Sequence, residues 1–244
     1  EEALAAAKEF PEMTLIPGVE LSTDIPGSEI HLLGLFINRG DEVFQKQLSN
    51  MREGRQGRAQ AMVEKLDELG VPVSWERVQE LAGDASIGRP HIAQAMVEAG
   101  YVKYPKDAFD KYLGRNGPAY TERLKLTPED AVRLVLANGA VPVMAHPTYS
   151  AAKSSRGEVG ELRDILSKLK KAGLAGIEVY YGDYTPEQVE WLAGLAKELG
   201  LIPSGGSDYH ASGNPGEPEP GTVGPPITTY EKLKEFHQKL ATRR

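Results

Sequence analysis

Five polar side chains in this sequence are of the types that bind divalent metal ions in hydrolytic enzymes. They are Glu20, His31, His146, Asp208 and His210. Each of them follows an apolar segment typical of a buried strand or, in the case of His31, lies within one. Imidazole suits Zn, Mn and Fe, and a carboxylate can bridge two ions. The combination therefore predicts a metal centre with hydrolytic activity.

Each of these residues, taken alone, also has an ordinary structural explanation. A single histidine in a strand, such as His31, is more often a hydrogen-bonded core residue, and Asp208 could cap a turn. His146 precedes a proline and could be structural as well. The joint pattern favours the metal centre, because four of the five histidines fall at strand ends or just before a helix. The other one, His237, lies in a polar terminal segment and is expected on the surface.

The elements that must position these residues alternate regularly in the second half of the chain. Helices are expected to begin near residues 127, 158, 185 and 229, and strands are expected at 140–145, 176–180 and 201–204. The pairs Thr127-Pro128 and Thr185-Pro186 are typical helix starts, because threonine caps the first turn and proline fits its first position. The alternation predicts parallel strands with right-handed crossovers and functional residues at the C-terminal ends of the strands.

The first half of the chain has a different pattern. Strands are expected at 14–20 and 29–37, joined by a turn over 22–28, and a long helix is expected over 41–69. Residues 71–126 contain several short helical segments and no clear strand. This block is typical of a helical insertion or cap in an α/β protein.

The composition narrows the possible functions. The chain of 244 residues carries 28 Lys and Arg against 35 Asp and Glu, a formal net charge of −7. This balance argues against a protein that coats nucleic acid through charge alone. The absence of cysteine excludes disulfides, thiolate zinc sites and cysteine nucleophiles. No apolar run approaches the roughly 20 residues of a membrane span, so we expect no membrane partner. The absence of cysteine fits a cytoplasmic location.

Several short motifs resemble those of the polymerase and histidinol phosphatase (PHP) family. They are Pro17–Ser22, Ile30–Gly34, Gly88–Ala93, Ala145–Pro147 and Gly206–His210. Their order and spacing resemble the stand-alone branch of that family, which hydrolyses 3′,5′-bisphosphonucleotides and the 5′ ends of short RNA. The resemblance covers essentially the whole chain.

The resemblance implies a fold and a division of the chain. The expected fold is an α/β protein, a distorted (βα)7 PHP barrel that is truncated at its N-terminus and contains a helical insertion. Residues 1–70 would form the first part of the barrel, 71–126 the helical insertion and 127–244 the second part. A monomer is expected.

The resemblance also implies the roles of the five metal-binding side chains. They would hold two or three divalent ions of Mn, Zn or Fe. Glu20 would bridge two metals, His31 and His146 would ligate one of that pair, Asp208 the other, and His210 the third. His146, His210 and Asp208 would form the catalytic set, and either histidine could assist proton transfer.

A phosphate-binding role is implied for Arg89 and His91 in the insertion. Arginine suits this role because its planar guanidinium binds phosphate oxygens in pairs. The alternatives are a surface salt bridge for Arg89 and a packing role at a helix N-terminus for His91.

The sequence departs from the family pattern at its start. It contains neither the His-x-His pair nor the Asp-His pair that open the family's metal site. Residues 1–10 resemble the second half of an amphipathic helix, so we expect the chain to begin inside a larger domain and to be weakly active or inactive by itself. Only the set of Glu20, His31 and His146 would remain nearly whole.

The function predicted from the sequence is metal-dependent phosphoester hydrolysis, with a small phosphorylated substrate such as a 3′,5′-bisphosphonucleotide or a short RNA end. Three alternatives remain open. The first is a histidinol-phosphate or sugar-phosphate phosphatase, and the second is a catalytically impaired binding module. The third, a polymerase-associated proofreading domain, is disfavoured because the chain contains no polymerase segment.

Overall fold

The computed structural model describes residues 2–25, 28–83, 87–121, 126–147, 158–182, 184–209 and 218–242. The chain forms two compact units. One comprises residues 42–124 and is helical in its described part. The other comprises residues 1–41 and 125–244 and contains a β-sheet. The helix 42–68, which the sequence analysis assigned to the first part of the barrel, belongs to the helical unit.

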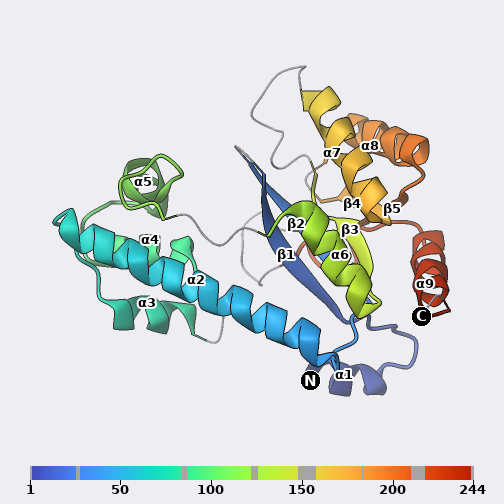
Figure 1. The fold of residues 1–244 in the computed structure, drawn as a ribbon, viewed down its shortest axis with the longest axis horizontal. Helices are drawn as coiled ribbons and strands as arrows, with labels where there is room; N and C mark the ends of the chain where they lie inside the picture. Colours follow the sequence, from blue (N-terminus) through green and yellow to red (C-terminus); the bar gives the residue numbers. More distant parts are fainter. Residues whose placement is uncertain are drawn as a thin grey trace. The chain divides into compact units, whose positions relative to one another are not determined.

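A mixed sheet is the centre of the unit formed by residues 1–41 and 125–244, the sheet unit (Figure 1). Its strands, in their order across the sheet, are β1 (Gly18–Ile25), β2 (Ser28–Leu35), β3 (Val141–Met144), β4 (Gly176–Tyr181) and β5 (Ile202–Gly206). β1 and β2 pair antiparallel, as do β2 and β3, whereas β3, β4 and β5 are parallel. The α/β class and the parallel strands of the second half are therefore confirmed.

The hairpin of β1 and β2 corrects the prediction for the first half. β1 does not end at Glu20, and most of the expected turn over 22–28 is strand. The physical reason is cross-strand pairing: Thr23 lies opposite Ile30, and its hydroxyl donates to the Ile30 carbonyl oxygen at 2.7 Å. β-Branched threonine also suits a half-buried strand.

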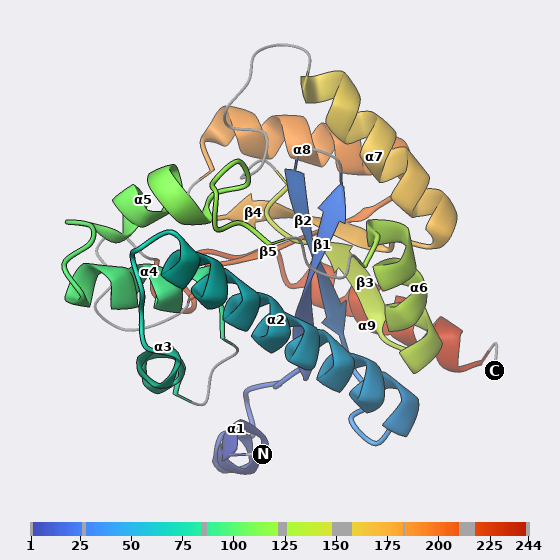
Figure 2. The ribbon, with the colours of Figure 1, turned by 60° about the vertical axis from the view of Figure 1, so that its left-hand side comes forward.

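The helices of the sheet unit are α1 (Glu2–Ala6), the short 3₁₀ turn η1 (Ala7–Glu9), α6 (Pro128–Asn138), α7 (Glu158–Ala172), α8 (Pro186–Leu199) and α9 (Thr228–Ala241). α6 and α8 begin as predicted, because the Thr127 hydroxyl accepts from the Asp130 amide and the Thr185 hydroxyl accepts from the Gln188 amide. Figure 2 shows α7 and α8 side by side.

One face of the sheet is apolar and packs against α6 (Figure 1). In β1 and β2 it carries Leu21, Thr23, Ile30, Leu32 and Gly34, which alternate with residues of the other face. Glycine at position 34 gives room for a close approach, since an added Cβ atom would lie 3.1 Å from a methyl group of Val135 in α6. This close approach holds the hairpin against the helix.

The opposite face is divided between a hydrophobic cluster and polar side chains. The cluster comprises Val141, Val143, Ala175 and Leu233, with Leu33, Leu35, Phe36, Ile202 and Phe236 packed against it. Its α9 residues cover this part of the face. Glu20 and His31 share the face with Leu33, as the register of the hairpin shows. Burial of the cluster thus fixes the orientation of the polar pair, since a one-residue slip would turn both side chains to the other face.

Leu32→Ala is expected to lower the free energy of unfolding by about 2–5 kcal/mol, because Leu32 is fully buried between the sheet and α6 and its loss leaves a cavity. Urea denaturation would measure this change. The control is Ile227→Ala, at a side chain that is 75% exposed, which is expected to change stability by no more than about 0.5 kcal/mol. Equal effects of the two substitutions would contradict the described packing.

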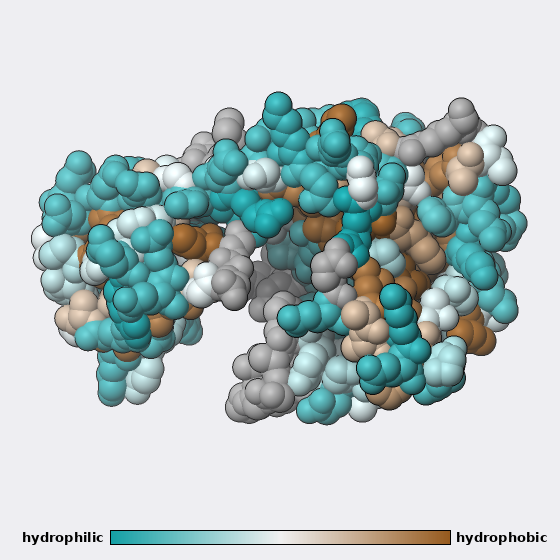
Figure 3. Space-filling view, turned by 90° about the horizontal axis from the view of Figure 1, so that it is seen from below, coloured by the Kyte–Doolittle hydropathy of each residue, from teal (hydrophilic) through white to brown (hydrophobic). Residues whose placement is uncertain are grey.

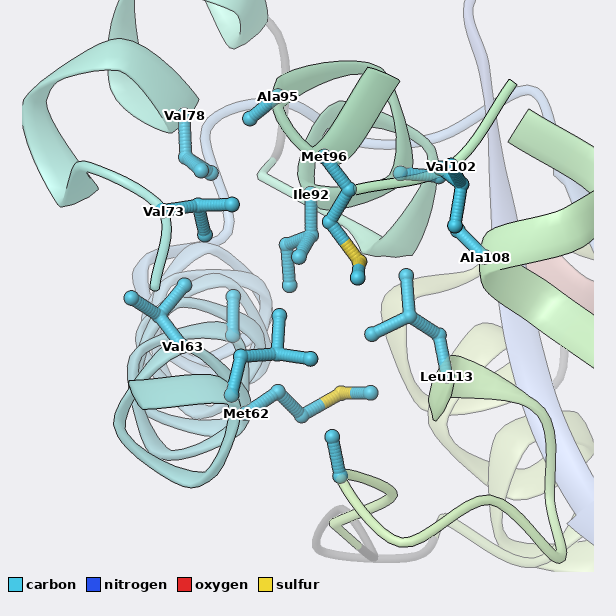
Figure 4. Close-up of a cluster of buried hydrophobic side chains, with 14 residues drawn as sticks. Met62, Val63, Val73, Val78, Ile92, Ala95, Met96, Val102, Ala108 and Leu113 are labelled. Carbon is cyan, nitrogen blue, oxygen red and sulfur yellow. The ribbon is translucent and has the colours of Figure 1, made fainter. Parts of the chain in front are cut away.

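The helical unit of residues 42–124 has its own core. Its helices are α2 (Glu42–Glu68), α3 (Trp75–Ala82), α4 (Arg89–Glu98), α5 (Pro105–Ala108) and the π-helical turn η2 (Phe109–Leu113). Figure 4 shows Met62, Ile92, Met96 and Leu113 pointing toward one another within this core. The described residues between 71 and 121 contain helices and no strand, in agreement with the sequence analysis.

Hydrophilic residues cover most of the molecular face drawn in Figure 3, and hydrophobic residues show between them in small groups. None of the helices in the described ranges combines the length and apolar composition needed to cross a membrane.

Candidate metal centre

Three donor atoms from distant parts of the sequence converge on the polar part of the sheet. Glu20 Oε1 lies 2.7 Å from His31 Nδ1 and 3.2 Å from His146 Nε2. The two histidine nitrogens are also 3.2 Å apart. Among the described residues, this is the group of carboxylate and imidazole side chains whose geometry suits a metal ion.

The β1–β2 hairpin and the end of β3 bring these atoms together. Glu20 lies opposite Leu33, and His31 lies opposite Ser22, so Glu20 and His31 are diagonal neighbours on one face. β3 extends along β2, and the Ala145 amide donates to the His31 carbonyl oxygen at 2.9 Å. The next residue, His146, has a backbone φ of 26°, an uncommon value for a residue other than glycine.

The triangle of donor atoms fits a first-row divalent ion. Bonds of about 2.0–2.1 Å at tetrahedral angles place two ligand atoms about 3.3 Å apart. Two sides of the triangle measure 3.2 Å, and the third side, at 2.7 Å, is a hydrogen bond between Glu20 and His31 that an ion would replace. Two imidazoles and one carboxylate are also a donor set that Zn, Mn and Fe accept.

Hydrogen bonds to the histidines hold the pKa of Glu20 well below its usual range, with His146 contributing most and His31 next. Burial by itself would lower the pKa of His31. Its interactions with the carboxylates of Glu20 and Glu29 outweigh that effect and raise the pKa to about 9. Glu29 Oε1 lies 3.7 Å from the second ring nitrogen of His31. In the absence of metal the site is therefore a compact cluster of a carboxylate and an imidazolium.

Strand β4 contributes two side chains that contact candidate ligands. The Glu178 carboxylate accepts a hydrogen bond from the His146 backbone amide at 2.8 Å. The Tyr181 hydroxyl donates to Asp208 Oδ2 at 3.0 Å, and its ring centroid lies 5.9 Å from that of His146. Glu178 is only 8% exposed, and this burial raises its pKa.

Glu178 and Tyr181 are not among the site residues predicted from the sequence. A signal for Glu178 was present, because it is the one charged residue in the apolar strand Gly176–Tyr181, as His31 is the imidazole within β2. Tyr181 gave no such signal, since tyrosine is ordinary in a strand.

The other predicted site residues have different positions. Asp208 follows β5 and contacts Tyr181, but it is not part of the three-donor group. His210 lies outside the described residues. His237, expected in solvent, is half-buried, and its ring stacks on Phe36 with centroids 4.9 Å apart.

Arg89 and His91 lie at the start of α4 in the helical unit. The Arg89 guanidinium donates to the Leu113 carbonyl oxygen at 3.4 Å and lies 5.5 Å from the centre of the Phe109 ring. His91 Nδ1 accepts from the Gly88 amide at 3.1 Å, so the imidazole satisfies a backbone group at the helix N-terminus. The alternative given above for His91 was a packing role at a helix N-terminus, and the observed contact is a hydrogen bond at such a terminus.

No family model matches the chain. Individual proteins do match it. The chain is 32% identical over 206 residues to the 5′-3′ exoribonuclease Rnm of Salmonella typhimurium, covering 81% of this chain and 66% of that enzyme, slightly less than two thirds of its length. It is 31% identical over 219 residues to the 3′,5′-nucleoside bisphosphate phosphatase of Chromobacterium violaceum, covering 88% and 74% of the two chains. A phosphoribosyl 1,2-cyclic phosphate 1,2-diphosphodiesterase of Eggerthella lenta is 30% identical, with coverage of 85% and 78%.

Solved structures agree with these relatives. A protein of Bifidobacterium adolescentis described as a metal-dependent phosphoesterase superposes with a TM-score of 0.76 at 28% identity, covering 96% of this chain and 80% of that one. An amidohydrolase of Chromobacterium violaceum, solved with bound sulfate and no metal, gives a TM-score of 0.78 at 29% identity, with coverage of 96% and 81%. The fold is thus similar to that of a protein described as a metal-dependent phosphoesterase. The chain belongs to the PHP-like phosphoesterase family of these relatives.

Proposed function

We propose that this chain hydrolyses phosphoesters with the help of divalent metal ions, and that its substrate is a 3′,5′-bisphosphonucleotide or the 5′ end of a short RNA. The convergence of Glu20, His31 and His146 is the observation that carries the proposal. The names of two relatives, an exoribonuclease and a nucleoside bisphosphate phosphatase, support the substrate class.

The proposed fold behind this activity is a distorted (βα)7 barrel, of which the five described strands form part. Its support is the position of the donors: His146 and Asp208 follow the C-terminal ends of the parallel strands β3 and β5. A monomer and a cytoplasmic location remain predictions from the sequence.

Glu20, His31 and His146 would hold one ion. Such an ion would act as a Lewis acid toward a phosphoryl oxygen and would lower the pKa of a bound water molecule toward neutrality. Glu20 contributes the negative charge of the site, and its fixed position between the two imidazoles keeps all three donors directed at one point. Asp208 and His210 are proposed to hold one or two further ions of Mn, Zn or Fe. A histidine, His146 or His210, would assist proton transfer.

Arg89 and His91 are proposed to bind the substrate phosphate. Arg89→Ala is expected to raise KM more than it lowers kcat, because a contact of equal strength in the ground state and the transition state affects binding alone. Steady-state kinetics on a bisphosphonucleotide would measure both constants. The matched control is Arg77→Ala on α3, an exposed arginine paired with Glu98. Unchanged KM and kcat in Arg89→Ala would show that Arg89 does not bind the substrate phosphate.

The test of the proposed function is hydrolysis with added Mn²⁺ and with excess chelator, measured as release of inorganic phosphate from the monoesters and as release of mononucleotides from the RNA. The substrates are a 3′,5′-bisphosphonucleotide, a 5′-phosphorylated short RNA and histidinol phosphate, the last of which tests the alternative phosphatase. We expect metal-dependent release from one of the first two. Turnover that is indifferent to the chelator would refute the metal mechanism, and turnover of histidinol phosphate alone would refute the substrate class.

A second candidate function is diester cleavage of a phosphoribosyl 1,2-cyclic phosphate. The observation that favours it is the Eggerthella lenta relative, of which this chain covers 78%. The same assay with this cyclic diester, followed by separation of the products, distinguishes the two candidates.

A further inference from the structure

Two of the candidate ligands have a backbone conformation that L-amino acids rarely adopt. The φ angle of His146 is 26°, and that of Asp208 is 53°. A residue other than glycine in this region is less stable by about 1–3 kcal/mol and persists only where its surroundings enforce it. Each residue lies two positions after the end of a parallel strand, where the chain must turn to direct a side chain at the site. The structure therefore needs groups that hold these two turns in place.

Strand β4, which lies between β3 and β5, supplies one such group to each turn. Glu178 accepts the His146 amide hydrogen at 2.8 Å, and the Tyr181 hydroxyl donates to Asp208 at 3.0 Å. The first contact reaches the turn after β3, and the second reaches the turn after β5. One strand thus contacts both of its neighbours at the points where their chains turn.

A bulge in β4 makes this arrangement possible. Residues three apart in a regular strand point to opposite faces, so Glu178 and Tyr181 would not normally share one. In the pairing with β5, however, Glu178 lies opposite Ser204, Tyr180 opposite Gly205 and Tyr181 opposite Gly206. β4 has one residue more than β5 in this interval, which brings Tyr181 to the same face as Glu178. Bulges of this kind often redirect a side chain next to an active site.

Gly205 is required for the bulge. A Cβ atom added there would lie 2.0 Å from the Tyr180 carbonyl oxygen, closer than any real contact. Gly205 thus allows the backbones of β4 and β5 to approach closely.

The burial of Glu178 argues against an incidental contact. The side chain is only 8% exposed, and a carboxylate in such a place lowers stability unless it is hydrogen-bonded. A leucine or isoleucine would fill an ordinary strand position more favourably. The acceptor that Glu178 offers to the His146 amide gives a reason for a carboxyl group there.

We propose that β4 is the positioning strand of the metal centre, with Glu178 fixing the backbone of His146 and Tyr181 fixing the carboxylate of Asp208. This inference rests on the proposed metal site and adds two positioning residues to it. Outer groups that orient a ligand commonly contribute about 10- to 100-fold to metal affinity.

The test compares three variants of the whole chain: Glu178→Ala, Glu178→Gln and Val179→Ala. Glu178→Gln keeps an oxygen that can accept the His146 amide hydrogen, so it is expected to retain most of the function. Val179 is a fully buried neighbour in β4, and its truncation is the control for a general loss of stability. Hydrogen exchange of the His146 amide, measured by NMR without metal, reports the contact itself. Calorimetric titration with Mn²⁺ reports its effect on the site.

We expect Glu178→Ala to speed exchange at His146 and to weaken Mn²⁺ binding about tenfold or more, while the other two variants stay close to wild type in both respects. Unchanged exchange or unchanged affinity in Glu178→Ala would overturn the positioning role, as would an equal loss of affinity in Val179→Ala. A wild-type chain that binds no Mn²⁺ would instead refute the metal site itself.

Tyr181→Phe tests the second contact, because it removes the hydroxyl and keeps the ring. It is expected to shift the Asp208 amide resonance and leave that of His146 near its original position, with Tyr184→Phe as the matched control. Gly205→Ala adds a Cβ atom for which the close approach of β4 and β5 leaves no room, so it is expected to shift both amide resonances. An undisturbed Asp208 in Tyr181→Phe would overturn the role of Tyr181.

Discussion

Glu20→Gln is expected to weaken Mn²⁺ binding by at least about 100-fold and to reduce phosphoester hydrolysis in parallel. The substitution keeps the size of the side chain but removes the one carboxylate that lies within 3.2 Å of both histidine nitrogens. The loss should exceed the roughly 10- to 100-fold effect of an outer group, since Glu20 would bond the ion directly. Calorimetric titration and metal analysis of the purified protein measure the effect.

Glu29→Gln is the matched control for that experiment. Glu29 is a second carboxylate near His31, but its oxygen lies 3.7 Å from the nitrogen that faces away from the three-donor group. We expect its replacement to change Mn²⁺ affinity less than tenfold. Equal losses in the two variants would mean that general negative charge attracts the ion, and the assignment of Glu20 as a ligand would be wrong.

The affinity for metal is expected to rise steeply with pH. The pKa of His31 is raised to about 9, so the ring is protonated in the metal-free protein at neutral pH. An ion binds the neutral imidazole and must displace this proton, which gives a tenfold gain in apparent affinity for each pH unit. The apparent metal affinity increases up to about pH 9 and levels off above that pH. A site with an unperturbed histidine would level off near 6.5 instead.

Calorimetric titration in buffers of different ionisation enthalpy counts the protons released when Mn²⁺ binds. We expect about one proton per ion at pH 7 in the wild type, and a smaller number in Glu20→Gln at matched pH, because the pKa of His31 falls when its main partner is lost. Binding that is independent of pH between 6 and 8 would contradict a protonated His31.

The ion pair of Glu20 and His31 also stabilises the metal-free protein, and this contribution falls as the pH rises. The folded-state pKa of His31 lies above the ordinary value of 6.5, so the contribution is fully present below about 6.5 and is lost as the pH rises through about 9. Metal binding and metal-free stability therefore respond to pH with opposite signs.

The second half of the fold could be predicted because its signals are local. Thr127 and Thr185 cap the helices that the sequence indicates, and short apolar segments between helices leave few choices other than parallel strands. The positions of His31 and His146 could be predicted for a related reason: each interrupts or ends such a segment. A polar side chain that interrupts or ends an apolar segment can be recognised from the sequence alone.

What could not be predicted depends on pairing and backbone angles. Nothing local separates a strand that ends at Glu20 from one that continues through Thr23, because that depends on the partner strand. The bulge in β4 is defined by its register with β5, which no segment of β4 encodes alone. The positive φ of His146 likewise accompanies a hydrogen bond to Glu178, which lies 32 residues later in the chain, and the residue type does not indicate it.

The order of the donors along the chain would make a shared ion a long-range cross-link. His31 and His146 are separated by 115 residues, and the whole helical unit of residues 42–124 lies between them in the sequence. An ion held by both histidines would close this stretch into a loop, as a disulfide does. The conformational entropy that such a cross-link removes from the unfolded chain changes only slowly with loop length. The helical unit could therefore gain or lose tens of residues with little change in the stabilisation that the cross-link provides.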